Sequence, residues 1–186
     1  RLSNTRTKTV LFSGSLQPEL VIIGEAPGNN EDEKGVGFIG LAGTLLRDTL
    51  KNIGIDPYGS IMYLNAVSCI PRDSKESPFR PPTNSEITTC MPRLSNIITA
   101  ILPSVKSYLL LGLMGYLAFQ SIITPSNLAD RVAKTRMSDI MGWSYYIDVP
   151  VLTAYHPSYI RRRNDKQLTQ EWVNSIKVLR EKLCKQ

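Results

Sequence analysis

Two polar residues that stand far apart in the chain could act together on a bound molecule. Glu25 follows the apolar segment 20–23, and His156, the only histidine, follows the apolar segment 149–152. A carboxylate can orient water or exchange a proton, and an imidazole can donate a hydrogen bond to developing negative charge. A single histidine is more often structural than catalytic, but both residues come where a buried strand would end. Parallel sheets bind ligands at that edge, so we expect Glu25 and His156 to belong to one active site.

The segment 24–43, which carries Glu25, has an unusual composition. It holds six glycines and one proline and includes the aromatic residue Phe38. Glycine lets another molecule approach the main chain closely. Structureless loops longer than about 12–15 residues usually have a function. The segment is therefore predicted to form part of a binding site rather than a plain surface loop.

Strands and helices are predicted to alternate along the chain. Apolar runs indicate strands at 19–24, 61–66, 106–111 and 150–155. Helical spacing and the cap residues at 83–86 indicate helices at 42–53, 84–101, 113–123 and 165–183. This alternation is typical of a parallel sheet covered by helices on both faces. We expect one α/β domain over residues 1–186, a three-layer α/β/α sandwich with a central, mainly parallel four-stranded sheet.

Two segments fall outside this alternation. The proline-rich, basic segment 70–83 predicts an irregular excursion, because proline is excluded from helix interiors and central strands. The segment 124–148 is compatible with a hairpin around Gly142. Neither segment interrupts the sequence with a repeat or a low-complexity tract, so neither marks a boundary between domains.

The charge of the chain suits a polyanionic partner. The formal net charge is +6, and Arg161, Arg162 and Arg163 directly follow the segment that begins at His156. A run of charges is usually just a solvated face, but this one adjoins the expected site. The longest apolar run, 108–119, is too short to span a bilayer, so no membrane partner is expected.

Four segments resemble, in order, the motifs of one enzyme family. The segment 24–43 is similar to the first motif of the uracil-DNA glycosylase superfamily, and 156–158 to its last. Between them, 63–69 is similar to the family's strand that ends in Asn and then Cys, and 86–90 resembles its later helix that carries a Cys. Together they resemble the family 4 branch, whose members hold an iron–sulfur cluster. The resemblance extends to about residue 172 and implies hydrolysis of the N-glycosidic bond of uracil flipped out of DNA, in base excision repair.

The resemblance also implies roles for single residues. Phe38 would stack on the base, and Asn65 would donate to and accept from its edge, as an amide can do at once. His156 would donate near uracil O2, while Glu25 would lie against the base and Glu31 would help either to position water or to stabilise a charged intermediate. The substrate-binding set implied by the resemblance comprises Gly24, Ala26, Phe38, Asn65 and His156, with Ala26 standing where the best-known branch carries an aspartate.

The segment after His156 resembles the family's minor-groove wedge. Tyr159 and Ile160 would fill the space left by the flipped base, because apolar side chains inserted between base steps distort DNA. An equally good interpretation of Ile160 is a hydrophobic staple for the last helix. The expected DNA-binding residues are Pro157, Ser158, Tyr159, Ile160, Arg161, Arg162 and Arg163.

The cysteines bear on a cofactor. Cys69 and Cys90 match the last two of the four cysteines by which family 4 holds a 4Fe-4S cluster, and the other two ligands would precede Arg1. Cys184 has no counterpart and is expected to be an ordinary thiol. An odd count of three argues against a disulfide framework, so we expect a reducing compartment, cytoplasmic or nucleoid-associated.

Two other functions compete with the glycosylase. One is a non-catalytic DNA-binding module on the same fold, for example attached to phage replication machinery. The other is an unrelated nucleotide-binding α/β protein, which is disfavoured because the sequence contains neither G-x-x-x-x-G-K-[ST] nor G-x-G-x-x-G. The expected partner is DNA that contains uracil, bound by a monomer unless the chain is part of a larger replication assembly.

Overall fold

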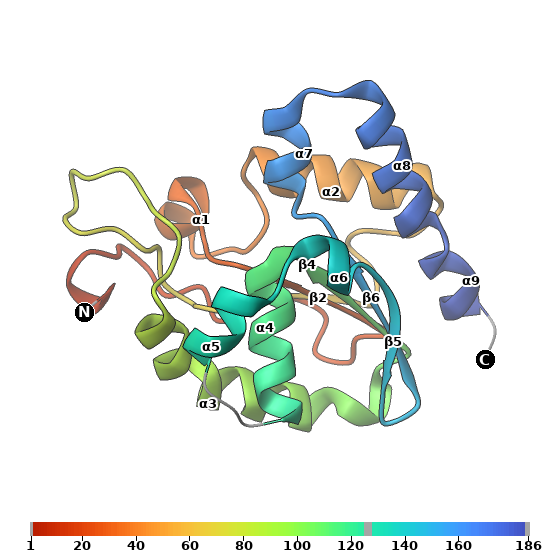
Figure 1. Cartoon of the computed structure of the whole chain (residues 1–186), viewed down its shortest axis with the longest axis horizontal. Helices are drawn as coiled ribbons and strands as arrows, with labels where there is room; N and C mark the ends of the chain where they lie inside the picture. Colours follow the sequence, from red (N-terminus) through yellow and green to blue (C-terminus); the bar gives the residue numbers. More distant parts are fainter. Residues whose placement is uncertain (1, 125–127, 185–186) are drawn as a thin grey trace.

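The computed structural model describes residues 2–124 and 128–184, whose strands form a single sheet flanked by helices (Figure 1). The spatial order of the strands is β1-β3-β2-β4-β6-β5. Their bounds are β1 Ser13–Gly14, β2 Leu20–Gly24, β3 Ile61–Asn65, β4 Ser107–Leu111, β5 Gly142–Tyr146 and β6 Val149–Ala154.

The four central strands are parallel, as the sequence predicts. β3, β2, β4 and β6 pair in parallel, and β2, β3 and β4 are buried at every position. Helices cover both faces of these strands, which explains why they are continuous apolar runs without alternation. The expected count of four strands is wrong, because β1 and β5 extend the sheet by antiparallel pairing at its two edges. β1 has only two residues and β5 is largely exposed, so neither had an apolar signature.

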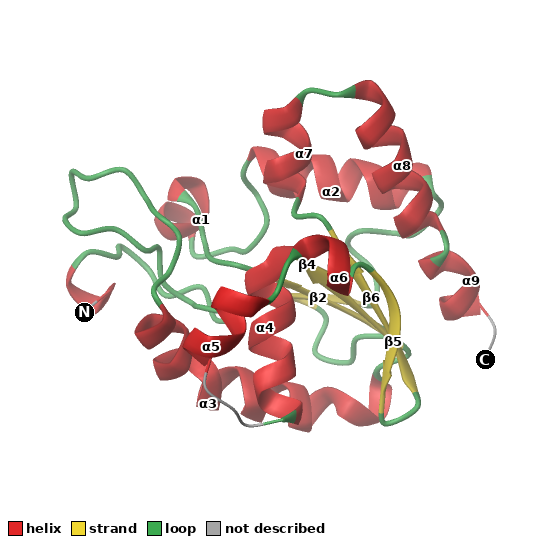
Figure 2. Ribbon diagram, viewed as in Figure 1, coloured by secondary structure: helices red, strands yellow, loops and turns green. Residues whose placement is uncertain are grey.

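Helices form a layer on each face of the sheet (Figure 2). Alternate side chains of β2 point to opposite faces of the sheet. Leu20 and Ile22 pack in a first core cluster, and Val21 and Ile23 pack in a second core cluster on the other face. The first side carries α2 Leu41–Asn52, α7 Pro157–Arg163, α8 Lys166–Lys177 and α9 Leu179–Cys184. The second side carries α3 Asn84–Ile101, α4 Gly112–Ile123 and α5 Leu128–Lys134.

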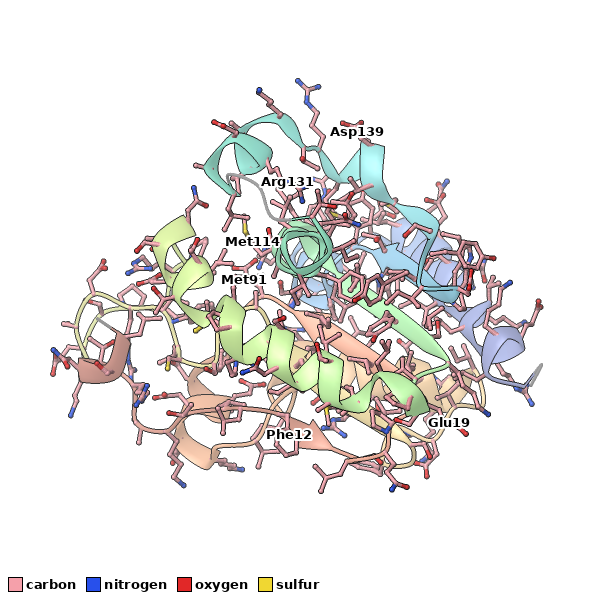
Figure 3. All side chains as sticks on the ribbon, turned by 90° about the horizontal axis from the view of Figure 1, so that it is seen from below. Phe12, Glu19, Met91, Met114, Arg131 and Asp139 are labelled. Carbon is pink, nitrogen blue, oxygen red and sulfur yellow. The ribbon has the colours of Figure 1, made fainter. Side chains whose placement is uncertain are left out.

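Figure 3 views the molecule from the side of α3 and α4. Met91 of α3 and Met114 of α4 both pack against the second cluster. Unbranched, flexible methionine side chains fill irregular gaps between helices. None of the helices in the described part of the chain is long and apolar enough to cross a membrane.

Several elements differ from the sequence-based expectation. The helix expected at 165–183 is divided at Val178 into α8 and α9. The loop expected after His156 is α7, and the glycine-rich segment contains a short helix, α1 Asn29–Lys34. The segment 124–148 contains α5, α6 Met137–Ile140 and β5, and the hairpin turns at Ile147 and Asp148, both with positive φ, rather than at Gly142. Short 3₁₀ turns occupy Leu2–Asn4 and Leu102–Ser104.

The segment 70–83 is irregular, as predicted, but ion pairs tie down both of its ends. Arg80 near its C-terminal end binds Asp73 at 2.8 Å and Glu86 at 2.9 Å. Thr83 then caps α3 by accepting from the Glu86 N–H, which confirms the cap expected there. In Figure 1 this segment lies beside α1 and the N-terminus.

A buried carboxylate holds the other end of that segment. Asp32 of α1 pairs with Arg72 at 2.9 Å, with side chains 3% and 12% exposed. Asp32 also accepts from the backbone N–H groups of Thr7 and Lys8, and Arg72 donates to the Thr5 carbonyl. Asp32 thus joins three stretches of chain that are distant in sequence.

Asp32→Ala should destabilise the protein by about 3 kcal/mol, because it leaves the Arg72 guanidinium buried without its partner. Urea unfolding followed by circular dichroism measures the loss. The matched control is Glu33→Ala on the same helix, whose side chain is exposed and whose removal should change the free energy of unfolding by at most about 0.5 kcal/mol. Equal stabilities of the two variants would contradict a structural role for Asp32.

Candidate active site

The carboxyl ends of three strands carry the predicted site residues to one edge of the sheet. Gly24 ends β2 and lies opposite Asn65, which ends β3. The pairing continues past both strands, since Ala66 N–H donates to the Gly24 carbonyl at 2.9 Å. β6 ends two residues before His156, the N-cap of α7. A cavity of about 160 Å³ lies at the opposite edge, beside the first residues of β2 and β3, and has no part in this site.

Three predicted side chains converge on Gly24. A Cβ placed on Gly24 would lie 2.7 Å from Asn65 Oδ1, 2.8 Å from Phe38 Cζ and 3.5 Å from His156 Nε2. Glycine suits this position, because a side chain would force the Asn65 amide and the Phe38 ring to shift, while it would meet His156 at ordinary contact distance. An aromatic face, an amide and an imidazole around one point suit a small planar polar molecule.

The hydrogen bonds of His156 define which ring nitrogen carries its proton. The backbone N–H of Ser158 donates to His156 Nδ1 at 3.2 Å, and the Ser158 hydroxyl lies 2.8 Å from the same nitrogen. Nδ1 is therefore an acceptor, and the proton of the neutral ring is on Nε2, the atom nearest Gly24. Burial, with a smaller contribution from Arg162, lowers the pKa of His156 to about 4. The ring is a neutral donor at physiological pH.

The two candidate carboxylates occupy different environments. Glu25 is partly buried, and this burial raises its pKa, while Arg162 acts in the opposite direction. Glu31 is 8% exposed and accepts from two backbone N–H groups, at Gly28 over 3.2 Å and at Gly40 over 2.7 Å. Glu31 therefore closes the glycine-rich segment by joining Gly28 to Gly40. Within the described part of the chain, the Glu25 carboxylate makes no such hydrogen bond.

Helix α7 presents some of the expected DNA-binding residues and buries others. Ile160 is 2% exposed and packs in the core under α7, so it acts as a staple and does not form the expected wedge. Tyr159 stacks on Tyr155 with ring centroids 4.9 Å apart, and Arg163 lies over Tyr159 at 5.9 Å. Pro157 is buried, whereas Ser158 is partly exposed. The exposed basic residues are Arg161, Arg162 and Arg163.

The two expected cluster ligands lie together. Cys90 Sγ is 4.0 Å from the hydroxyl of Ser68, the residue before Cys69, and Arg6 lies 3.0 Å from Cys69 Sγ. In the described part of the chain no three potential metal ligands gather in one place. The described residues therefore bring Cys69 and Cys90 into one region, with Arg6 from the start of the described chain beside Cys69. The side chain of Cys184 lies outside the described residues.

A buried cation adjoins this cysteine pair. Burial lowers the pKa of Arg93, and the nearby Cys90 and Cys69 oppose that shift. Arg93 donates to the carbonyls of Asn65, at 2.6 Å, and Ala66, at 3.2 Å, while its buried Nε has no partner among the described residues. A buried positive group with an unused donor is suited to an anionic group held by the thiols, so the residues present fit two ligands of an iron–sulfur cluster.

Sequence reasoning missed several residues that shape the site. A Cβ on Gly43 would overlap the Phe38 carbonyl, and Arg47 donates to that carbonyl at 3.1 Å. Gly112, at φ 75°, leaves room for His156, because a Cβ added at Gly112 would lie 3.1 Å from the His156 Cβ. A glycine within the apolar pattern of a helix was the available signal for Gly43. Nothing in the sequence distinguished Arg47 from a surface cation.

Comparisons with known proteins agree with this geometry. A family model described as the uracil DNA glycosylase superfamily matches residues 12–180. The chain is similar to the type-4 uracil-DNA glycosylase of Archaeoglobus fulgidus, at 32% identity over 188 positions that cover 98% of this chain and 85% of the relative. It is also similar to those of Pyrobaculum aerophilum, at 30% identity with 87% and 78% covered, and Thermotoga maritima, at 29% identity with 88% and 77% covered. The resemblance noted in the sequence is thereby confirmed.

The depressed pKa of His156 predicts a pH dependence of stability. Between pH 6.5 and about 4 the unfolded chain binds a proton that the folded chain excludes, so the free energy of unfolding falls as the pH falls. Relative to His156→Gln, the wild type should lose about 2–3 kcal/mol between pH 7 and pH 4.5. Denaturant unfolding at the two pH values measures this difference. A difference that does not change with pH would show that His156 titrates normally.

Proposed function

The chain belongs to the uracil-DNA glycosylase superfamily, and we propose that it hydrolyses the N-glycosidic bond of uracil flipped out of DNA, in base excision repair. The observation that carries this proposal is the convergence of Phe38, Asn65 and His156 on Gly24. A base inside a duplex is out of reach of these groups, so the nucleotide must leave the stack first.

The flipped base meets groups of matching chemistry. The Phe38 ring supplies a flat apolar face against which uracil stacks. The Asn65 amide accepts from the ring N–H with its oxygen and donates to a carbonyl with its nitrogen. Gly24 leaves the space between them open, and Ala26, packed against the core, completes the proposed substrate-binding set.

His156 would act on the charge that appears as the bond breaks. When the bond between the sugar carbon and the base nitrogen breaks, the electron pair stays with uracil, and part of its charge lies on O2. The neutral Nε2–H donates to that oxygen, and a donor of this kind lowers a barrier by about 3–4 kcal/mol. Burial of His156 strengthens the interaction, because water does not compete for the oxygen.

Hydrolysis also requires water at the sugar carbon. Glu25 is the better candidate to orient it, because Glu31 is already engaged by the N–H groups of Gly28 and Gly40. The water oxygen bonds to the sugar carbon, its proton passes to a carboxylate and then to the departing base, and the products are free uracil and an abasic site. Glu31 contributes by holding the loop that carries Phe38.

The DNA backbone would be held by the exposed strip on α7. Arg161, Arg162 and Arg163 follow the partly exposed Ser158 and Tyr159, so phosphates can approach the site from this helix. Arg162 has a second effect, since its charge opposes the burial that raises the pKa of Glu25 and adds to the burial that lowers the pKa of His156. Its charge favours an ionised carboxylate, a neutral imidazole and the uracil anion.

Cys69 and Cys90 would supply two of the four ligands of a 4Fe-4S cluster. When bound, the cluster would cross-link the segments that carry its cysteines. Arg6 and Arg93 offset the negative charge of the thiolates.

The competing function, the domain count, the oligomeric state and the location of the protein are also matters of proposal. A non-catalytic DNA-binding module is not favoured, because the relatives are named as glycosylases and Phe38, Asn65 and His156 converge on Gly24. We retain as predictions a single domain over residues 1–186, a monomeric state outside larger replication assemblies, and a place with the DNA in the cytoplasm or nucleoid.

The purified protein should release uracil from a uracil-containing oligonucleotide without added nucleotide cofactors. His156→Ala should slow the single-turnover rate by two to three orders of magnitude while DNA binding is kept, because it removes the donor to uracil O2. Asn65→Ala should also slow release strongly, because the base edge loses both of its partners. Alkali-labile strand cleavage measures the rate on single- and double-stranded substrate. No release from either strand form at enzyme excess would refute the proposed function.

Substitution of an arginine on α7 should have the opposite effects to His156→Ala: weaker DNA binding and an unchanged rate of uracil release. Arg161→Ala should weaken DNA binding at any sequence and reduce the salt slope by about one unit, with the saturated rate unchanged. Lys177→Ala, an exposed basic residue at the end of α8, should change neither quantity. An unaltered salt slope for Arg161→Ala would mean that the strip is only a solvated face.

The full-length protein, purified anaerobically, should be brown and contain about four iron and four sulfide per chain. Cys69→Ser and Cys90→Ser should each lose most of the iron, whereas Cys184→Ser should keep it. Elemental analysis and visible absorbance give the readout. Colourless wild-type protein without iron would make Cys69 and Cys90 ordinary structural thiols.

A further inference from the structure

Phe38 has a backbone conformation that its own chemistry disfavours. Its φ is 58°, in the left-handed region that bulky side chains rarely adopt. Such a conformation persists only where the surroundings over-determine it, and it occurs preferentially at functional sites. Phe38 is 6% exposed, and its ring lies 5.4 Å from the ring of Tyr63. The neighbours of Phe38 must therefore supply the interactions that keep its ring in place.

Helix α2 supplies the first of these interactions. Gly43 faces the main chain of Phe38 so closely that an added Cβ would overlap the Phe38 carbonyl group. The backbone of α2 at Gly43 therefore packs directly against the main chain of Phe38. This contact prevents the Phe38 main chain from moving toward α2, but it does not by itself select the left-handed conformation.

Arg47 stands one turn after Gly43 and holds the same peptide from the side. Its Nε donates to the Phe38 carbonyl at 3.1 Å, and Nη2 donates to the Gly37 carbonyl at 3.3 Å. Two successive carbonyls that accept from one planar group fix the orientation of the peptide between them.

The guanidinium of Arg47 is itself held firmly. Its Nη1 donates to the Pro57 carbonyl at 3.3 Å, and the group lies 4.4 Å from the centre of the Tyr63 ring. The Tyr63 hydroxyl donates to the same Pro57 carbonyl at 2.8 Å. Arg47 therefore fixes the backbone of Phe38 while it stacks on the ring that supports the Phe38 side chain.

We propose that Arg47 is a positioning residue for uracil binding, which fixes the Phe38 ring before the base enters. The proposal rests on the proposed function only in taking Phe38 as the stacking face. Without Arg47, the Phe38 backbone relaxes toward an ordinary φ and the ring moves away from Asn65 and His156. A displacement of about 1 Å at a reacting group can slow an enzyme by a factor on the order of 100.

A purely stabilising role for Arg47 makes a different prediction. If Arg47 only supported α2, its loss would lower activity by the same factor whether or not Phe38 were present. If Arg47 acts through Phe38, its loss should matter little once the ring has been removed. A double-mutant cycle separates these two cases.

The experiment compares wild type, Arg47→Met, Phe38→Ala and the double variant in single-turnover release of uracil. Arg47→Met should reduce kcat/KM by about 10- to 100-fold and weaken inhibition by free uracil, with binding to uracil-free DNA unchanged. In the Phe38→Ala background the same substitution should cost less than about twofold. Lys51→Met, an exposed residue on the next turn of α2, is the control and should match wild type.

The outcomes distinguish this inference from the function on which it rests. Equal losses from Arg47→Met in both backgrounds, or unchanged inhibition by uracil, would overturn the positioning role while the glycosylase activity of the wild type stands. A wild type that releases no uracil would instead refute the proposed function. If Arg47→Met does not fold, Arg47→Lys keeps the cation without the two-pronged bond, and full activity of that folded variant would also overturn the proposal.

Discussion

The parallel pairing of β2 with β3 is the constraint on which the site depends. It places Gly24 opposite Asn65, and the Ala66 N–H bond to the Gly24 carbonyl extends the register beyond the strands. A slip of one residue would send the Asn65 side chain to the other face, because side chains alternate along a strand. β4 then separates β2 from β6, which sets the distance that His156 must span to reach the same point. The sheet thus aligns the amide and the imidazole before any loop contributes.

The glycine-rich segment is held to this frame by two neighbouring carboxylates with separate tasks. Glu31 joins the two ends of the segment through the N–H groups of Gly28 and Gly40. Asp32, the next residue, ties α1 to Arg72 and so to the segment 70–83. Successive residues of a helix point about 100° apart, which lets one short helix serve both tasks. The loop can therefore be rich in glycine and still be ordered, because buried charge-assisted bonds replace the apolar packing that it lacks.

The helix after His156 combines structure and recognition in seven residues. Ile160 faces the core, Tyr159 stacks between Tyr155 and Arg163, and the arginines face solvent. In this ladder, Tyr159 and Arg163 share one face of α7 by their four-residue spacing, whereas Tyr155 precedes the N-cap His156 and stacks on Tyr159 from outside the helix. A rigid ladder of this kind holds the start of α7, and with it the Ser158 N–H that sets the tautomer of His156. The arginines proposed to meet DNA thus lie on the helix that begins directly after His156, the proposed donor to the base.

The sequence by itself determined the central parallel strands, most of the helices and the residues that converge on Gly24. Those inferences were possible because burial on both faces leaves continuous apolar runs, and because the motif residues come at strand ends. The tertiary structure alone decided that Ile160 belongs to the core and that Glu31 closes a loop, because an isolated residue type does not reveal which neighbour faces it. It also decided to which carbonyls Arg47 and Arg93 donate. Arg47 donates to a carbonyl nine residues away and Arg93 to one 28 residues away, and no spacing pattern in the sequence indicates either contact, since each arises only when packed helices meet the ends of the sheet.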